Sequence, residues 1–195
     1  MIDPSQATWA QIFAAIEAAI TTLTGLTVIW SWQNYNAPPL NYVRVGIGSA
    51  ATVGQDWIQE WQTGSSTPNE EFALTVGGLR EVALQIEAFS ASTVETEAAA
   101  TSLSIVDTVT AGLYLPSIRA ALNAVGFTPF APGPTNYIPD VVSTGFRGRA
   151  VCDVRSYLPA RMVEEYATFI ASVALDANVS GTGNGTTIDV PITAN

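Results

Sequence analysis

The chain has 195 residues, contains no histidine and no lysine, and carries a single cysteine, Cys152. Histidine, lysine and cysteine supply most of the general bases, amine nucleophiles and thiolates that work near neutral pH, so the composition argues against an enzyme. The net charge of −10 argues against a protein that grips the phosphate backbone of nucleic acid.

Charge is also scarce, at 12% of the residues against about 25% in an ordinary soluble domain. A surface with so little charge predicts a subunit of an assembly, whose surface is reserved for neighbours. A monomer solvated by serine, threonine, asparagine and glutamine is the alternative. The longest charge-free run, residues 18–43, is interrupted by glycine, asparagine and two prolines, so no membrane span is predicted.

The first 48 residues predict a helix followed by two strands. Asp3 and Gln6 have the spacing of a capping box at the start of the helix, and Gly25 is expected to end it. Strands are predicted over residues 26–33 and 41–48, joined as a hairpin. The residues that share one helical face are Trp9, Ile12, Phe13, Ile16, Ile20 and Leu23.

The next segment, residues 49–62, is compatible with either a strand or a helix, and in both cases Trp57 and Trp61 share a face. A long strand is predicted over residues 71–90, with a bend at the pair Gly77-Gly78. In its second half, apolar and polar residues alternate: Val82, Leu84 and Ile86 against Glu81, Gln85 and Glu87.

A pair of helices is predicted in the middle of the chain. Ser92 and Glu95 have the spacing of a capping box, and a second, short helix is expected to begin at Pro116 and stop before Gly126. The stripe predicted to be buried on the first of these helices consists of Ala99, Leu103, Val106 and Leu113.

After the helices, the proline- and glycine-rich segment 128–136 predicts a loop. Further strands are predicted over residues 137–143, 149–158 and 163–177. The fold class is therefore α+β: a single antiparallel or mixed sheet with an N-terminal helix, a central helix pair and a C-terminal extended arm. The expected division is one domain over residues 1–180 and a Gly/Thr-rich arm over 181–195, which is expected to lie against something, such as a neighbouring subunit.

Two short motifs have a functional and a structural interpretation. Residues 46–51 fit the Gly-x-Gly-x-x-Ala dinucleotide fingerprint, with Glu70 and Glu71 about 20 residues on, but no alternating βαβ pattern surrounds them. We interpret them as a strand with two glycines. Residues 176–181 resemble the first half of a calcium loop, but Thr187 stands where such a loop needs a bidentate glutamate, so a turn is favoured.

Four of the seven arginines lie between residues 147 and 161. A strand here would place Arg149, Val151, Asp153 and Arg155 on one face, where arginine's planar fork suits ion pairs across an interface. A phosphate-binding patch is the alternative, but Asp153 lies in its middle. Interface residues are predicted to be Arg80, Arg147, Arg149, Asp153, Arg155, Trp57 and Trp61.

The order of elements resembles the neck or tail-terminator proteins of tailed bacteriophages over roughly residues 6–180. The resemblance rests on the strand 79–89, the alanine-rich helix after it, the short helix 116–125, and the segment 149–158 with the long strand that follows. It implies a structural virion protein with no catalytic residues and no cofactor. Its expected form is a ring, commonly of six subunits, that ends the tail tube and joins it to the head-side connector.

The same resemblance implies assembly in the host cytoplasm and passage of DNA through the ring without sequence-specific binding; acids facing the lumen would keep DNA from adhering. Two other hypotheses stay open. One is a carboxylate-dependent hydrolase, which needs two acids about 5–10 Å apart across a cleft. The other is a monomeric binding module that uses the Trp57/Trp61 face.

Overall fold

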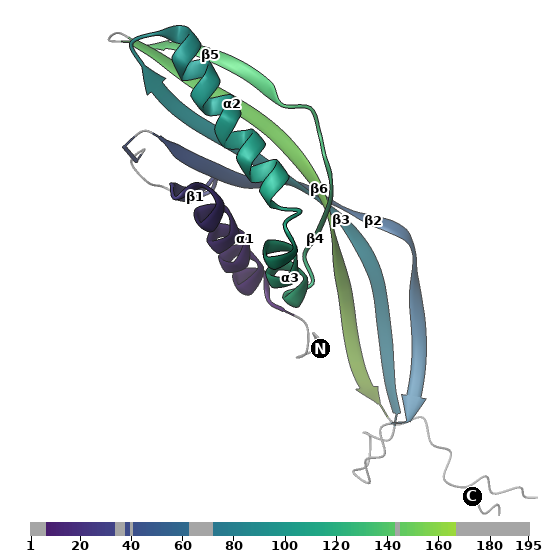
Figure 1. Cartoon of the computed structure of the whole chain (residues 1–195). Coiled ribbons are helices and arrows are strands. Elements are labelled where there is room, and N and C mark those ends of the chain that lie inside the picture. Colours follow the sequence, from purple (N-terminus) through teal and green to yellow (C-terminus); the bar gives the residue numbers. More distant parts are fainter. Residues whose placement is uncertain (1–6, 34–37, 40, 63–71, 143–144, 167–195) are drawn as a thin grey trace, which may run out of the picture. The chain divides into compact units, whose positions relative to one another are not determined.

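The computed structural model describes residues 7–33, 38–39, 41–62, 72–142 and 145–166 (Figure 1). The chain divides into two compact units, Met1–Ile58 with Thr75–Val163, and Gln59–Leu74 with Glu164–Asn195. The account below concerns the first unit, which holds most of the described residues. The elements are α1 (Trp9–Thr24), β1 (Thr27–Trp30), β2 (Tyr42–Gln62), β3 (Phe72–Ser92), α2 (Glu95–Gly112), α3 (Pro116–Ala124), β4 (Thr128–Pro132), β5 (Asn136–Val142) and β6 (Gly145–Tyr166).

The strands form one mixed sheet in the order β1-β2-β3-β6-β4, and β5 also pairs with β6. β1 is parallel to β2, whereas β4 and β5 are antiparallel to β6. In Figure 1, the arrow of β3 runs opposite to those of β2 and β6. The three helices and the mixed six-stranded sheet confirm the predicted α+β class.

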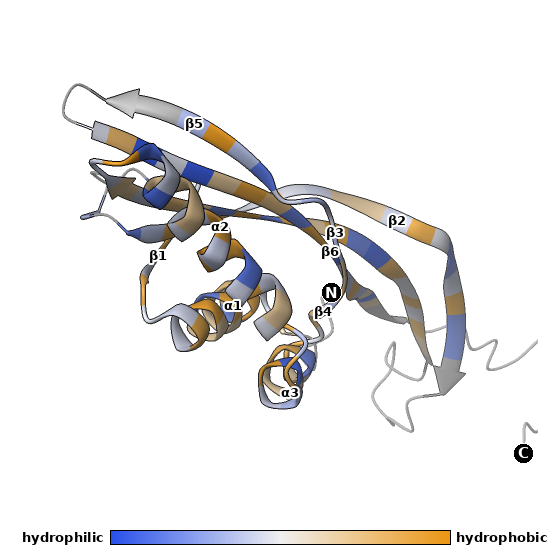
Figure 2. Ribbon diagram, turned by 45° about the horizontal axis from the view of Figure 1, so that its top comes forward, coloured by the Kyte–Doolittle hydropathy of each residue, from blue (hydrophilic) through white to orange (hydrophobic). Residues whose placement is uncertain are grey.

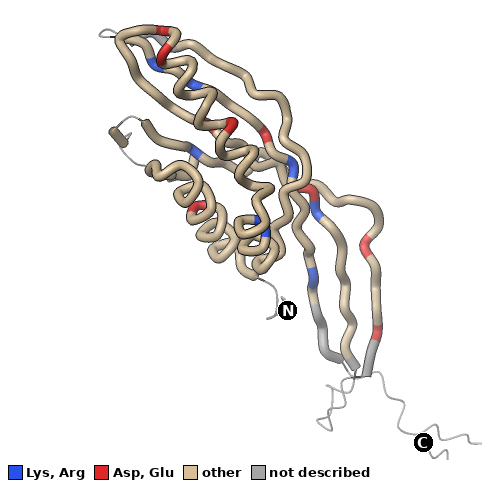
Figure 3. The backbone as a smooth tube through the Cα atoms, in the orientation of Figure 1, with Lys and Arg blue, Asp and Glu red and all other residues tan. Residues whose placement is uncertain are grey.

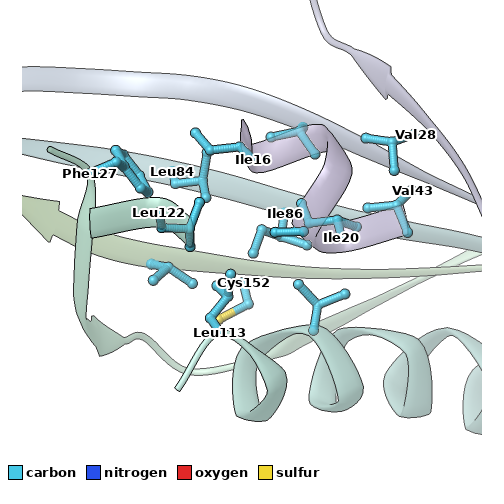
Figure 4. Close-up of a cluster of buried hydrophobic side chains, with 14 of the residues drawn as sticks. Ile16, Ile20, Val28, Val43, Leu84, Ile86, Leu113, Leu122, Phe127 and Cys152 are labelled. Atoms are coloured by element: carbon cyan, nitrogen blue, oxygen red, sulfur yellow. The ribbon is translucent and has the colours of Figure 1, made fainter. Parts of the chain in front are cut away.

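All three helices cover the same face of the sheet (Figure 2), and the core lies between the two layers (Figure 4). Because side chains alternate along a strand, every second residue of β3 and β6 points into this core, as the sequence predicts for β3. Burying one large apolar side chain contributes about 1.5–3 kcal/mol. The central residues are Ile12, Ile16 and Ile20 of α1, Val106 and Val109 of α2, Leu122 of α3, and Val82, Leu84, Ile86, Cys152 and Val154 of the sheet.

Helix α1 is capped by a different capping box from the predicted one, formed by Thr8 and Gln11, and it begins at Trp9. The Thr8 hydroxyl accepts a hydrogen bond from the backbone N–H of Gln11, whose side chain in turn accepts from the Thr8 N–H. Asp3 and Gln6 lie outside the described residues. The predicted end at Gly25 is confirmed, because this glycine takes the left-handed conformation, with φ of 68°, that closes a helix.

The predicted hairpin of the first two strands is wrong. β1 and β2 are parallel, with Thr27 opposite Tyr42 and Trp30 opposite Val45. The connection, residues 31–41, is long enough to return the chain to the starting end of β1, whereas a tight turn would have reversed it. The ambiguous segment 49–62 is strand, continuous with β2.

The predicted loop over residues 128–136 is also wrong, because it contains β4 and the start of β5. β4 lies at the edge of the sheet, where one side of the strand has no partner to receive a backbone N–H, so Pro129 and Pro132, which lack that group, are tolerated there. The strands predicted at 149–158 and from 163 onward are one strand, β6, which is described as far as Tyr166.

The central helices lie where the sequence predicts them, but the first is capped differently. α2 begins after Val94, and the Ser92 hydroxyl accepts from the Val94 N–H and donates to the Glu97 carboxylate, so no Ser92–Glu95 capping box forms. The buried residues of α2 are Ala98, Ser102, Val106, Val109 and Gly112. Of the predicted stripe, Val106 and Leu113, the residue directly after the helix, are buried, whereas Ala99 and Leu103 are only half-buried. α3 begins at Pro116 and ends before Gly126, as predicted.

In the part of the chain described, no single helix is long and apolar enough to cross a membrane. α2 and α3 satisfy length and composition only when taken together, and they are bent by 70° at the break between them. Residues 34–37, between the first two strands, and residues 167–195, including the predicted arm, lie outside the described residues.

Candidate functional site

The face of the sheet opposite the helices, here called the helix-free face, carries an ion-pair cluster. The carboxylate of Glu87 on β3 accepts hydrogen bonds from Arg44 of β2 and, at 3.0 Å, from Arg149 of β6. Glu87 is buried, at 4% exposure, although it lies opposite the core. Both guanidinium groups lie over the ring of Phe89, which stacks on Tyr42.

Further along the helix-free face, weaker contacts continue the pattern. The Arg155 guanidinium lies 3.9 Å from the Glu81 carboxylate, and 61% of its side chain stays exposed. It also lies over Phe130 of β4, 5.9 Å from the ring centroid. The Asp153 carboxylate accepts a hydrogen bond of 3.3 Å from Gln85.

The predicted placement of these residues on one face is therefore confirmed, and their role in an interface stays a prediction. Arg149, Asp153 and Arg155 do lie on one face of β6, together with Val151. Arg149, however, is bound to a buried acid of its own chain, and Asp153 faces a glutamine. Charged residues are sparse along the described backbone (Figure 3), and three of the arginines, Arg44, Arg80 and Arg149, have a carboxylate within 3.0 Å.

Arg80 forms the other strong pair, on the side of the sheet that the helices cover. Its two guanidinium nitrogens bind the two carboxylate oxygens of Asp56 at 2.7 and 2.8 Å. The hydrogen bond from Arg80 lowers the pKa of Asp56, and the hydrogen bond to Asp56 raises the pKa of Arg80. The pair lies directly over Gly78, where a Cβ atom would fall on the Asp56 carboxylate.

The neighbouring glycine makes room for Trp57. A Cβ atom at Gly77 would lie 2.4 Å from the indole ring, so the tryptophan packs flat against the bare backbone. Trp57 is nevertheless 47% exposed. The glycine pair, predicted to bend β3, thus provides space for an aromatic ring on one face and an ion pair on the other. The side chain of Trp61, on β2, lies outside the described part.

Arg147, the remaining predicted interface residue, is half-buried on β6 opposite Asp140 of β5. It interacts within the described structure. The sequence-predicted interface residues therefore do not form one site. Arg147, Arg149, Asp153 and Arg155 lie along β6, whereas Arg80 and Trp57 lie on β3 and β2, on opposite faces.

Sequence reasoning missed a groove at the start of α1. We call it the α1 groove; it has a volume of about 690 Å³. Two of its lining residues, Trp9 and Met162, are 44% and 60% exposed. The only sign of the groove in the sequence was the apolar side chain of Met162 among the polar residues near the end of β6. The groove is lined by Ala7, Thr8, Trp9 and Ile12 of the helix start, Ala50 and Thr52 of β2, Arg80 and Val82 of β3, and residues 158–162 of β6.

A row of aromatic rings continues from the wall of the groove. Trp9 packs on Phe13, Phe13 on both Trp30 and Trp32, and these two tryptophans stack with ring centroids 4.7 Å apart. Trp32 is 53% exposed, whereas Trp30 is buried and its indole N–H donates to Glu17. The row lies beside β1, an edge strand of the sheet.

The dinucleotide fingerprint has no structural support. Gly46 and Gly48 lie inside the continuous strand β2, and no helix follows them, whereas a phosphate-binding turn would need a helix N-terminus there. The calcium-loop resemblance at residues 176–181 lies outside the described residues. Among the residues that are described, no three of the acids and Cys152 gather to hold a metal ion.

The chain was compared with known proteins. No curated protein matches it. The family model described as phage neck terminator protein matches residues 10–184, which include every helix and strand of the structure except the first residue of α1. The match covers most of the chain and agrees with the resemblance drawn from the element order. The chain therefore belongs to the phage neck terminator protein family, and it is a structural protein of the phage neck.

Proposed function

We propose that the protein assembles into a closed ring, of six copies, that ends the tail tube and joins it to the head-side connector. The observation that carries the proposal is the family match over residues 10–184. The low content of charged residues supports it, since a surface with 12% charge suits a subunit covered by neighbours. The exposed tryptophans Trp9, Trp32 and Trp57 add apolar area that a neighbour would cover.

The asymmetry of the sheet suits a ring. One side of the sheet ends in the short strand β1, and the other side ends in β4 and β5. A ring forms when one surface of a subunit meets a different surface of the next at a fixed rotation. Among the predicted interface residues, Arg155 and Trp57 have large exposed side chains, 61% and 47% exposed. These two residues are therefore the strongest candidates for the contact between neighbouring subunits.

The net charge of −10 supports a role in DNA passage without binding. Acidic groups on a lumen wall repel phosphate and let the duplex slide, which fits an expected channel with no sequence-specific contacts. An image reconstruction of the ring tests this point, because acidic side chains should line the channel. A lumen lined by arginine would contradict it.

The proposed partners are the tail tube protein and the head-side connector, and the proposed site of assembly is the host cytoplasm before the virion is complete. The first measurement is the mass in solution by light scattering across a concentration series. Six copies of the 20.5-kDa chain give 123 kDa. If the protein stays a monomer alone, purified tail tubes should trigger ring formation at their ends. A protein that remains monomeric and unbound in both conditions would contradict the proposal.

A further inference from the structure

β1 is the last strand on its side of the described sheet, and its sequence favours pairing with a further strand. Its four residues, Thr-Val-Ile-Trp, are β-branched or aromatic, carry no charge and include no proline. The strands on the other side differ, because β4 contains Pro129 and Pro132 and β5 contains Pro139. Proline lacks a backbone N–H and is one of the residues that keep an edge strand from pairing with another chain. β1 has no such protection within its own four residues.

The backbone groups that β1 turns outward follow from its parallel register. Trp30 is opposite Val45 of β2, and the N–H of Ser31 donates to the Val45 carbonyl at 2.8 Å. In a parallel pair, the N–H and C=O of one residue point to the same side, and those of the next residue point to the other side. The N–H and C=O of Trp30 therefore point away from β2, toward the position of a further strand.

Gln33 occupies both of these groups. Its side-chain amide oxygen accepts a hydrogen bond from the Trp30 N–H, and its backbone N–H donates to the Trp30 carbonyl, both at 3.0 Å. One acceptor and one donor are what the facing residue of an adjacent antiparallel strand would supply. Gln33 thus takes the place of such a residue, and we call this pair of hydrogen bonds the Gln33 cap.

Aromatic packing holds the Gln33 cap in place. The hydrogen bond from the Gln33 N–H to the Trp30 carbonyl closes a four-residue turn, and Trp32 lies within that turn. The Trp32 ring stacks on Trp30 with centroids 4.7 Å apart and packs on Phe13 at 4.9 Å. The row of aromatic rings therefore fixes the turn that places Gln33 over the edge of β1.

We propose that the Gln33 cap closes the edge of β1 against β1 of a second copy. Val28 lies two residues before Trp30, so its N–H and C=O point to the same outer side. In an antiparallel pair of two β1 strands, Val28 of each copy would exchange hydrogen bonds with Trp30 of the other, and the two Ile29 residues would face each other. Gln33 already holds the Trp30 groups, so a second copy has to displace it.

The dimer that the cap opposes is of a different kind from a ring. A β1–β1 pair is two-fold symmetric and closed after two copies, whereas a ring needs one surface of a subunit to meet a different surface of the next. The cap therefore suppresses a dead-end dimer of the free protein. The inference goes beyond the proposed ring, and its test uses the free protein without tail tubes.

Disulfide trapping of the full-length chain tests the cap. Ile29→Cys places two thiols opposite each other in the β1–β1 pair, where facing Cα atoms lie about 4.5 Å apart, within the range of a disulfide. Three proteins are compared: Ile29→Cys alone, Ile29→Cys with Gln33→Ala, and Ile29→Cys with Gln55→Ala. The last is the matched control, because it removes the same side chain from an exposed position of β2. Native Cys152 is 1% exposed and is present in all three.

We expect a band at twice 20.5 kDa that forms about tenfold faster with Gln33→Ala than in the other two proteins, since one competing hydrogen bond is lost. Equal rates in all three proteins, whether fast or slow, would overturn the inference, because the edge would then be open or closed regardless of Gln33.

Hydrogen exchange of the Trp30 amide measures the cap in each copy directly. Gln33→Ala should speed this exchange at least about fivefold, because the acceptor of the Trp30 N–H is gone. Gln33→Glu should keep the slow exchange, because a carboxylate oxygen accepts the same hydrogen bond. Trp30 exchange that is as slow in Gln33→Ala as in the unmodified protein would contradict the contact on which the inference rests.

Discussion

Replacing Glu87 by glutamine removes the negative charge that Arg44 and Arg149 share on the helix-free face of the sheet. The substitution keeps the size of the side chain, so it tests the charge rather than the packing. Both arginines would then lie beside a neutral amide, and part of that amide would offer donors where the guanidinium groups need acceptors.

The expected cost follows from the exposure of the three side chains. Breaking a fully buried ion pair costs about 3–5 kcal/mol, and exposed pairs contribute about 0–1 kcal/mol. The Glu87 side chain is 5% exposed, but those of Arg44 and Arg149 are 35% and 34% exposed, so water can solvate them again. We therefore expect Glu87→Gln to lower the free energy of unfolding by about 2 kcal/mol, or Tm by about 4–8 °C.

Urea unfolding followed by circular dichroism measures this cost, with Asp107→Asn on the exposed side of α2 as the matched control. The control should stay within about 0.5 kcal/mol of the unmodified protein. In an Arg149→Met background the cost of Glu87→Gln should shrink, because one of the two partners is already gone. A folded Glu87→Gln variant as stable as the control would refute the assignment of Glu87 as the charge that holds β2, β3 and β6 together on this face.

Three further predictions concern other contacts. Gly77→Ala should displace the Trp57 ring, because the new Cβ would lie 2.4 Å from it; we expect a red shift in tryptophan emission that vanishes in a Trp57→Phe background, and an unshifted spectrum would contradict the packing. Asp56→Asn should lower Tm less at pH 2 than at pH 7. Its carboxyl pKa is lowered by Arg80, so the stabilisation is present above the unfolded pKa of about 3.9 and is lost as the pH falls through the folded pKa; an equal difference in Tm at both pH values would speak against it. Cys152 should react with a thiol reagent at least about tenfold more slowly in the native protein than in urea, because burial raises the pKa of its thiol and blocks access; equal rates would show an open core.

The secondary structure was predicted best where a single strong local signal decides it. The glycine after α1, the proline before α3 and the alternation in β3 each restrict the backbone or one face directly, and all three predictions are confirmed. Helix starts were predicted less well, because several residues near each start could serve as the cap. The Thr8–Gln11 pair competes with Asp3–Gln6 on equal terms in the sequence.

Strand pairing was predicted poorly for a different reason. Whether β1 and β2 pair as a hairpin or in parallel depends on where the connection between them leads, which no local residue pattern records. β4 was missed because its prolines signal a loop, and only the edge position, a property of the whole sheet, makes them acceptable.

The order of elements was enough to indicate the phage neck terminator family, because the succession of helices and strands is a property of the chain itself. The chemistry of the arginines was decided by the tertiary structure. Glu87 is 43 positions from Arg44 and 62 positions from Arg149 in the sequence. It lies between them only because β2, β3 and β6 are neighbours in the sheet. The α1 groove likewise exists only where three strands pass the first turn of a helix, since concave surfaces arise from the packing of distant segments rather than from any one of them.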